Sequence, residues 1–396
     1  DLIEAINSNF SIVLLVDQKD SAGENINFFN KKVKTQIGFL KIARKFNIPI
    51  VPIKNTRLNN GKIELSFLKP IYHNNININD TNKYIIEKDI VWASPKGFDL
   101  TLDIYSPSKK EEAVPVLIIF HGGGWLVNNK SIMDQMAQYL ATNSNYVICN
   151  VNYRLLADLD NSVTLNEIIE DAFGALLWIK ENIANYGGDK NRIAVTGDSA
   201  GAHIAAMIVN SGKQINNKNN FPKSLKFTPT YMPEDKSIEE INLQNLMSVQ
   251  ASILSYGAFD IYSSAIYGLE TSNNPFWFFS GTSPRGVFGE GYAYFTHPEM
   301  YKALSPVFNI PSSEERVLPP QFLLVGSKDK LTTPEFVLDY KKELESEGHP
   351  VDFWIYQDKG HAFLDSGTNY FLGNSFEKDA PEALNRMIKF LDKVFR

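Results

Sequence analysis

Short apolar runs that alternate with amphipathic segments dominate the chain after residue 84. The runs are five to seven residues long and nearly free of charge, as expected for strands that are buried on both faces of a sheet. They are "PVLIIF" (115–120), "YVICNV" (146–151), "IAVTG" (193–197), "ASILSYG" (251–257), "QFLLVG" (321–326) and "VDFWIY" (351–356). Segments with helical spacing lie between them. This alternation predicts an α/β fold around a mostly parallel sheet.

The chain has 396 residues, which is long for one compact domain. The asparagine-rich stretch "HNNININDTNK" (73–83) is typical of a linker. We therefore expect a small N-terminal α/β segment at 1–75 and a main domain at 76–396. Two stretches of the main domain, 211–250 and 262–300, break the alternation and are interpreted as inserts.

Composition excludes several classes of protein. The net charge is −6 and no basic tract occurs, so a nucleic-acid partner is not expected. No apolar run approaches the roughly 20 residues of a membrane span. The single cysteine, Cys149, cannot form an intrachain disulfide, and its apolar neighbours predict a buried thiol. Because the first residues also lack a signal-peptide pattern, we expect a cytoplasmic protein.

The stretch "VTGDSAGAH" (195–203) places Ser199 between two glycines, after a predicted strand and before a predicted helix. Gly197-x-Ser199-x-Gly201 in that context is typical of a nucleophile elbow, where small neighbours permit the sharp turn that exposes the serine. Alone, the pattern is also compatible with a serine that only caps the helix. A second motif decides for the nucleophile.

That motif is "FHGGGW" (120–125), which follows the buried run 115–120. Three consecutive glycines cost conformational entropy, and one reason to keep them is backbone N–H groups that can approach an oxyanion closely. His-Gly-Gly-Gly after a strand takes this role in lipase-like hydrolases. We predict the N–H groups of Gly123, Gly124 and Ala200 as the donors; the alternative is a glycine-rich turn without a ligand.

Four histidines follow Ser199 and are candidates for the general base: His203, His297, His349 and His361. His203 lies in the predicted helix and is expected to pack. His297 lies in an insert, and His349 is expected in an exposed turn. His361 follows the strand 351–356, and loops at the carboxyl ends of parallel strands carry the chemistry of such sheets. We therefore predict His361 as the base.

The acid is expected after a strand that precedes the histidine strand. Asp329 follows the run 321–326, and Asp260 is the second candidate. Asp198 is expected to bond locally. Glu170 and Asp171 precede the serine and are interpreted as surface or structural residues. His361 then removes the proton of Ser199 and Asp329 orients the imidazole, with no metal or organic cofactor required.

The insert 262–300 is rich in aromatic residues. Such an insert can add to the core or cover an apolar substrate pocket. For the second case we expect pocket residues at Trp125, Phe276, Trp277 and Phe278.

Residues from about 84 to 396 carry the motifs "LDIYSP", "HGGGW", "VNYRL", "YGGDKNRIAVTGDSAGAH", "LPPQFLLVGSKDKL" and "GHAF". With these motifs the chain resembles the α/β-hydrolase carboxylesterases of the hormone-sensitive-lipase-like group and their feruloyl-esterase-like and arylformamidase-like relatives. The resemblance implies an eight-stranded mixed sheet with a cap and cleavage of esters of modest size. It also implies Ser199, Asp329 and His361 as the catalytic triad.

Residues 1–75 resemble the C-terminal portion of lipid A lauroyl-type acyltransferases. The residues that carry this resemblance are Asp17-Gln18, Phe28-Phe29, Thr35, Gly38 and "IPIVPI". The catalytic His-x4-Asp motif of that family is absent, since no histidine precedes His73. We expect strand, helix, strand, strand, with Val33, Ile37, Leu40 and Ala43 on one helix face. The segment is expected to dock on the hydrolase part or to pair with a second copy, giving a homo-oligomer.

The expected activity is hydrolysis of short-to-medium acyl esters through an acyl-enzyme. A lactone, an aryl or feruloyl ester and an N-formyl amide remain open as substrates, because the same triad serves all of them. Two other classes are a non-catalytic binding protein, which the complete set of site residues argues against, and an acyltransferase, which the missing motif argues against.

Overall fold

The computed structural model describes residues 19–28, 31–35, 53–57, 63–67, 84–108, 112–212, 215, 227–369 and 372–396. The chain divides into two compact units, Asp1–Asn82 and Lys83–Arg396. In the first unit, two antiparallel hairpins are described: β1 (Lys19–Phe28) with β2 (Lys31–Thr35), and β3 (Ile53–Arg57) with β4 (Ile63–Phe67).

The helix expected through Val33 is wrong at that residue, because Val33 lies in strand β2. From Lys32 onward the segment "KKVKT" alternates lysine with β-branched residues, a pattern that suits a hairpin strand better than a helix. The other residues of the expected helix face, Ile37, Leu40 and Ala43, lie outside the described residues.

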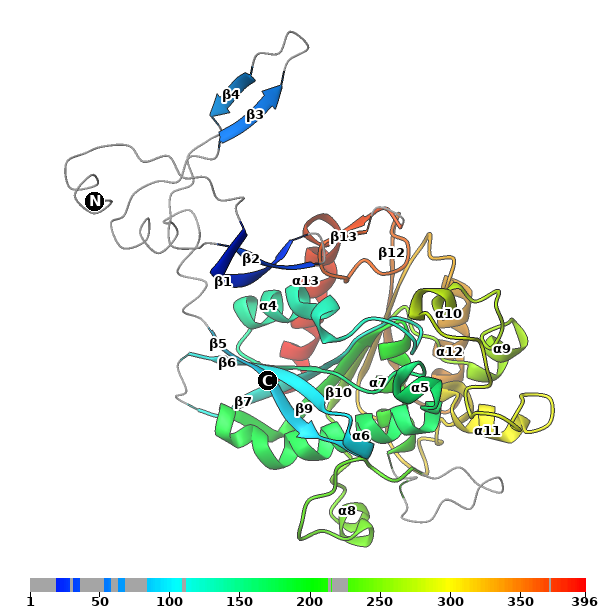
Figure 1. The fold of residues 1–396 in the computed structure, drawn as a ribbon. Coiled ribbons are helices and arrows are strands. Elements are labelled where there is room, and N and C mark those ends of the chain that lie inside the picture. The colour runs from blue at the N-terminus through cyan, green and yellow to red at the C-terminus, as the bar shows by residue number, and fades with distance from the viewer. Residues whose placement is uncertain are drawn as a thin grey trace. The chain divides into compact units, whose positions relative to one another are not determined.

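An eight-stranded sheet forms the centre of the second unit, with the strand order β12-β11-β10-β9-β7-β8-β6-β5 (Figure 1). Its strands are β5 (Tyr84–Ala93), β6 (Leu100–Pro107), β7 (Val114–Phe120), β8 (Val147–Val151), β9 (Gly188–Asp198), β10 (Ala251–Ser255), β11 (Gln321–Gly326) and β12 (Val351–Tyr356). β6 pairs antiparallel with β5 and β8, and all other neighbours are parallel. The predicted mostly parallel sheet is confirmed.

Helices cover both faces of this sheet (Figure 1). On one face α4 (Asp134–Asn143) packs against α13 (Phe376–Phe395), and on the other α6 (Leu165–Asn182) packs against α7 (Ala200–Ser211). α12 (Pro334–Ser346) contacts β11 and β12. Short 3-10 helices lie at Pro95–Gly97, Lys130–Met133, Ile183–Tyr186 and Pro306–Phe308.

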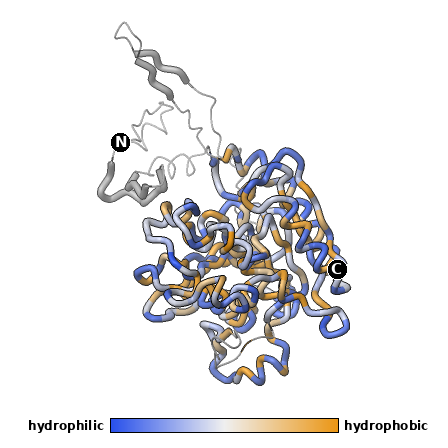
Figure 2. Tube along the Cα trace, turned by 90° about the vertical axis from the view of Figure 1, so that its right-hand side faces the viewer, coloured by the Kyte–Doolittle hydropathy of each residue, from blue (hydrophilic) through white to orange (hydrophobic). Residues whose placement is uncertain are grey.

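The core lies between the sheet and these helices. Every residue of β7, β8, β10 and β11 is buried, and Figure 2 shows apolar segments running through the interior of the unit. Cys149 is buried in β8, as expected, and burial raises the pKa of its thiol. The edge strand β12 is only half-buried, because among the described strands it has a neighbour on one side only.

The two inserts contain short helices. Within 211–250 the described part includes α8 (Ile238–Leu243). Within 262–300 lie α10 (Pro275–Ser280), most of α9 (Ile261–Ile266) and the first half of α11 (Pro298–Ala303). α5 (Asp158–Asn161) and the small hairpin of β13 (Thr368–Asn369) and β14 (Asn374–Ser375) complete the unit. No helix in the described parts of the chain has both the length and the apolar character needed to cross a bilayer.

Candidate active site

Ser199 occupies a tight turn between strand β9 and helix α7. Its backbone has φ 51° and ψ −117°, a left-handed conformation that a residue with a side chain rarely adopts. The surroundings leave no room for larger neighbours: a Cβ on Gly197 would lie 2.3 Å from the carbonyl carbon of Gly201, and one on Gly201 would lie 2.0 Å from the oxygen of Phe120. The turn is therefore strained, and its two glycines are required by close backbone contacts.

His361 lies in the loop after β12, and its partner Asp329 lies in the loop after β11. The imidazole Nδ1 is 2.8 Å from Asp329 Oδ2, and both side chains are buried. The Tyr256 ring contacts the His361 ring edge-on, with ring centres 4.8 Å apart. Since Nδ1 faces the carboxylate, Nε2 is the nitrogen left for a reaction partner.

Asp329 is held by the turn that follows it. Its Oδ1 accepts hydrogen bonds from the backbone N–H groups of Leu331 (2.9 Å) and Thr332 (3.0 Å). The Thr332 hydroxyl lies 3.3 Å from both Asp329 Oδ2 and His361 Nδ1, and donates to the carbonyl of Tyr256 at 2.7 Å. Thr332 was not anticipated from the sequence, although a threonine three residues after an aspartate is a typical turn pattern.

The glycine-rich loop after β7 is held in left-handed conformations, with φ 123° at Gly123 and 59° at Gly124. A Cβ on Gly123 would lie 2.2 Å from the carbonyl oxygen of Val127, and one on Gly124 would lie 2.9 Å from the Phe276 ring. Ala200 is the first residue of α7, so its N–H has no acceptor within the helix and lies at the positive end of the helix dipole.

These elements meet at a cavity of about 230 Å³. Its wall includes Ser199, His361, Gly124 and Ala200, whereas Asp329 and Gly123 do not line it. The remaining lining residues are Trp125, Ala258, Ser264, Tyr267, Gly268, Leu269, Asn273, Asn274, Phe276, Leu331 and Thr332. The loops after five strands, β7, β9, β10, β11 and β12, and the insert 262–300 thus form one site.

Trp125 and Phe276 lie on this wall, but Trp277 and Phe278 do not. Successive residues of a helix point about 100° apart, so one turn of α10 cannot aim three aromatic rings at one cavity. Trp277 is 1% exposed and its indole N–H donates to the carbonyl of Leu269 at 2.8 Å, whereas Phe278 is 82% exposed. The aromatic insert therefore contributes both to the core and to the cavity.

The other histidines are engaged elsewhere. His349 was expected in an exposed turn, but this expectation is wrong, because the residue is only 3% exposed. Its Nε2 donates to the carbonyl of Pro311 at 2.7 Å. The turn after α12 folds back over residues 311–318, which buries the ring. His297 packs on Tyr292 within the insert, and His203 is buried in α7.

The remaining acidic candidates have structural partners. Asp260 caps α9 by accepting from the N–H of Ser263 at 2.8 Å. Asp171 is buried and pairs with Arg154 at 2.7 Å. Burial raises the pKa of Asp198 to about 6, against the opposing effects of His361 and of hydrogen bonds to its carboxylate.

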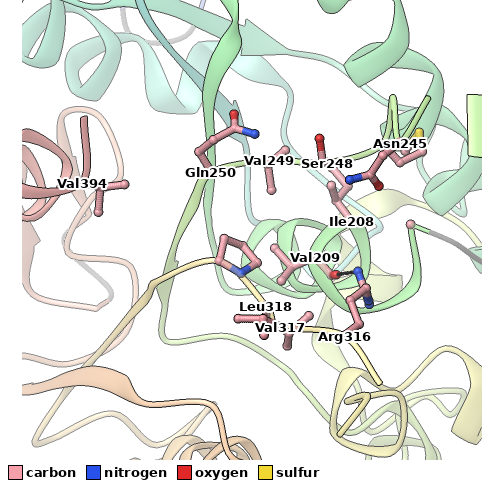
Figure 3. A pocket seen from close by; sticks show the side chains of 13 residues that line it. Ile208, Val209, Asn245, Ser248, Val249, Gln250, Arg316, Val317, Leu318 and Val394 are labelled. Atoms are coloured by element: carbon pink, nitrogen blue, oxygen red, sulfur yellow. Dashed lines mark hydrogen bonds between the residues drawn. The ribbon is translucent and has the colours of Figure 1, made fainter. Parts of the chain in front are cut away.

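A larger cavity of about 540 Å³ lies at the C-terminal end of α7 (Figure 3). It is formed by the end of α7 and by the segments that precede β10 and β11, and Arg316 donates there to the carbonyl of Val209 at 2.9 Å. No histidine lines it among the described residues. The described residues also contain no cluster of three metal-ligating side chains.

The sheet order, the strained serine turn and the His–Asp pair define an α/β-hydrolase. Residues 102–344, more than half of the chain, match the family BD-FAE, and the chain belongs to that family. The match begins at residue 102, so the acyltransferase resemblance of residues 1–75 stays a prediction.

Curated relatives include several named esterases. Carboxylesterase NlhH of Mycobacterium tuberculosis is 33% identical over 117 residues, which cover 30% of this chain and 35% of that protein. Liver carboxylesterase 1 of Oryctolagus cuniculus is 34% identical over 117 residues, 28% of this chain and 20% of that protein. The chain thus spans about a third of the length of NlhH and a fifth of that of liver carboxylesterase 1.

Solved structures share the fold. Esterase 2 of Thermogutta terrifontis superposes with a TM-score of 0.54 at 20% identity, covering 78% of this chain and 92% of that one. A truncated carbohydrate esterase from gut microbiota superposes with a TM-score of 0.56 at 18% identity, covering 79% and 97%. At this identity the likeness establishes the α/β-hydrolase fold.

Proposed function

We propose that the chain is a serine esterase for short-to-medium acyl esters. The observation that carries the proposal is that Ser199, in its strained turn, and His361, paired with Asp329, line the same cavity. The esterase names among its relatives support the same activity.

In the first step, Ser199 Oγ attacks the ester carbonyl carbon while Nε2 of His361 accepts the serine proton. Asp329 holds Nδ1–H and stabilises the imidazolium that forms. The carbonyl oxygen becomes an oxyanion that accepts hydrogen bonds from the N–H groups of Gly123, Gly124 and Ala200. The C–O bond to the alcohol then breaks, and the alcohol leaves with the proton from His361.

In the second step, water attacks the acyl-serine carbonyl. His361 accepts a proton from that water and returns one to Ser199 as the ester bond to the serine breaks. The products are the free carboxylic acid and the restored enzyme. Since every charge that develops is met by a backbone N–H or by the His–Asp pair, this chemistry needs no metal ion.

The cavity supports small acyl groups. Its volume of about 230 Å³ lies below the roughly 300–1,000 Å³ that is usual for ligand sites. Its wall combines Trp125, Leu269 and Phe276 with the side chains of Asn273 and Asn274. Esterase 2 of Thermogutta terrifontis has been solved with propionate and with butyrate bound, acids of the size that we propose here.

The test is hydrolysis of p-nitrophenyl esters from acetate to laurate by the wild type and by Ser199→Ala. We expect the highest kcat/KM among the shorter esters and a loss of at least about 10³-fold in the variant. Ser211→Ala, at the other end of the same helix, is the matched control and should retain wild-type rates. Undiminished hydrolysis by Ser199→Ala would overturn the proposal.

A further inference from the structure

His203 makes two hydrogen bonds that fix its protonation state. It is fully buried in α7, one helical turn after Ser199. The Trp125 indole Nε1 donates to Nδ1 of His203 at 3.2 Å, and Nε2 of His203 lies 2.7 Å from the carbonyl oxygen of Leu304. An indole N–H only donates and a carbonyl only accepts, so Nδ1 is the acceptor and Nε2 carries the hydrogen.

The surroundings keep this ring neutral. Burial lowers the pKa of His203 to about 4, although the carbonyl of Leu304 favours the protonated form. Protonation would place an N–H on Nδ1 against the indole N–H, so the bond to Trp125 exists only in the neutral ring. The indole also contacts the imidazole edge-on, with ring centres 5.2 Å apart.

The partners of His203 belong to two other parts of the site. Trp125 directly follows Gly124 in the oxyanion loop, lies on the cavity wall and has a left-handed backbone with φ 60°. Leu304 is the C-cap residue of α11, the helix that begins at the end of the insert 262–300. One imidazole therefore joins the serine helix, the glycine-rich loop and the end of α11.

We propose that His203 is a positioning residue, whose neutral Nε2–H ring fixes the Trp125 indole and through it the N–H of Gly124 in the oxyanion loop. The proposal rests on the proposed esterase function. A phenylalanine could fill the same space, but it would leave the Trp125 N–H and the Leu304 carbonyl without their partners. The hydrogen bonds thus give this position a role that packing alone does not require.

The kinetic test compares His203→Phe, which keeps a ring and removes both bonds, with His203→Gln, whose amide can accept from Trp125 and donate to Leu304. With p-nitrophenyl acetate we expect His203→Phe to lose about ten-fold in kcat with little change in KM, because oxyanion contacts act mainly in the transition state. His203→Gln should recover to within about three-fold of the wild type. Equal losses in both variants would overturn the proposal.

A double-mutant cycle with Trp125→Phe separates positioning from general destabilisation. Trp125→Phe keeps an aromatic ring but removes the N–H, so His203→Phe should lower kcat much less in that background than in the wild type. Fully additive losses would contradict the link between the two residues.

Nitrogen NMR of the folded wild-type protein reads the ring directly and needs no activity. We expect a neutral Nε2–H signature for His203 throughout pH 5–8, and loss of the Trp125 indole N–H shift in His203→Phe. A charged ring or an Nδ1–H tautomer at pH 7 would refute the assignment. If the NMR signals are as expected but no ester is cleaved, the proposed esterase function fails and the hydrogen bond between His203 and Trp125 stands. If Ser199→Ala is inactive and both His203 variants match the wild type, only the positioning role of His203 fails.

Discussion

At the scale of single residues, the site depends on backbone contacts that exclude a methyl group. Gly201 is the sharpest case, because a Cβ there would collide with the carbonyls of both Phe120 and His121. The collision would push α7 away from β7 and tilt Ser199. Strain at the serine is therefore maintained by close packing of main-chain atoms around it.

We predict that Gly201→Ala lowers the free energy of unfolding by about 3 kcal/mol, the upper range for overpacking, and reduces ester hydrolysis strongly. Urea unfolding followed by fluorescence measures the first effect. Gly360→Ala is the control for stability, since a Cβ at Gly360 meets no atom within 4 Å and the residue has no left-handed φ. Equal stability of Gly201→Ala and the wild type would contradict the contact argument.

The buried His121 ring should make the free energy of unfolding depend on pH. The ring is buried, its Nδ1 donates to the carbonyl of Gly122 at 2.8 Å, and Tyr153 stacks on it with ring centres 4.4 Å apart. Burial lowers its pKa from 6.5 to about 4. Between these pH values the unfolded chain binds a proton that the folded chain does not, so stability is lost as the pH falls.

The loss attributable to His121 amounts to about 3 kcal/mol at pH 4. We expect His121→Gln to show a correspondingly smaller drop in the free energy of unfolding between pH 7 and pH 4.5 than the wild type. His297→Gln, in the insert 262–300, should keep the wild-type drop. The acid Asp198 acts in the opposite direction, since burial raises its pKa to about 6, which is why the difference between variants is the quantity to measure.

At the scale of elements, strands were predicted best where the whole strand consists of mostly apolar residues. The runs 321–326 and 351–356 coincide with β11 and β12, whereas β9 starts at Gly188, before the expected run 193–197, because its first residues are polar. The short helices of the insert 262–300 were not predicted, since six residues are too few to show a helical period.

The residues of the candidate site also differ in how well the sequence predicts them. Ser199 and the glycine-rich loop carry local patterns that the sequence displays, because their geometry depends on neighbours in the chain. The contacts of Thr332 and of His203 join segments that are far apart in the sequence. No local pattern could predict these contacts. Of the three neighbouring aromatic residues of α10, the one that lines the cavity could not be identified without the orientation of the helix.

Glu270 joins parts of the insert 262–300. Its Oε1 accepts from the N–H of Val287 at 2.7 Å and from the hydroxyl of Tyr301 at 2.6 Å, and its neighbour Leu269 lines the cavity. We predict that Glu270→Ala loosens the insert, raises KM several-fold and changes kcat less than about two-fold. Faster amide hydrogen exchange within 262–300 would report the loosening.

Glu290→Ala provides the comparison, because Glu290 lies in the same insert and is exposed. It should leave both KM and exchange rates at wild-type values. If Glu270→Ala behaved in the same way, the hydrogen bonds of Glu270 would not hold the insert.

At the scale of the whole molecule, every residue of the candidate site lies in the unit Lys83–Arg396. We therefore predict that deletion of residues 1–82 keeps kcat/KM within about two-fold of the full chain. The role that we propose for the N-terminal unit is docking or self-pairing, so the deletion should instead change solubility or oligomeric state. Light scattering coupled to gel filtration measures the latter; identical assembly and solubility of both forms would refute that role.

The central claim is that Ser199 is the nucleophile, and covalent trapping tests it most directly. The full chain is treated with a p-nitrophenyl alkylphosphonate, and intact mass and peptide mapping locate the adduct. We expect one phosphonyl group on Ser199, loss of esterase activity in proportion to labelling, and no adduct in Ser199→Ala. Stoichiometric labelling of a different residue, or full activity of a protein labelled at Ser199, would contradict it.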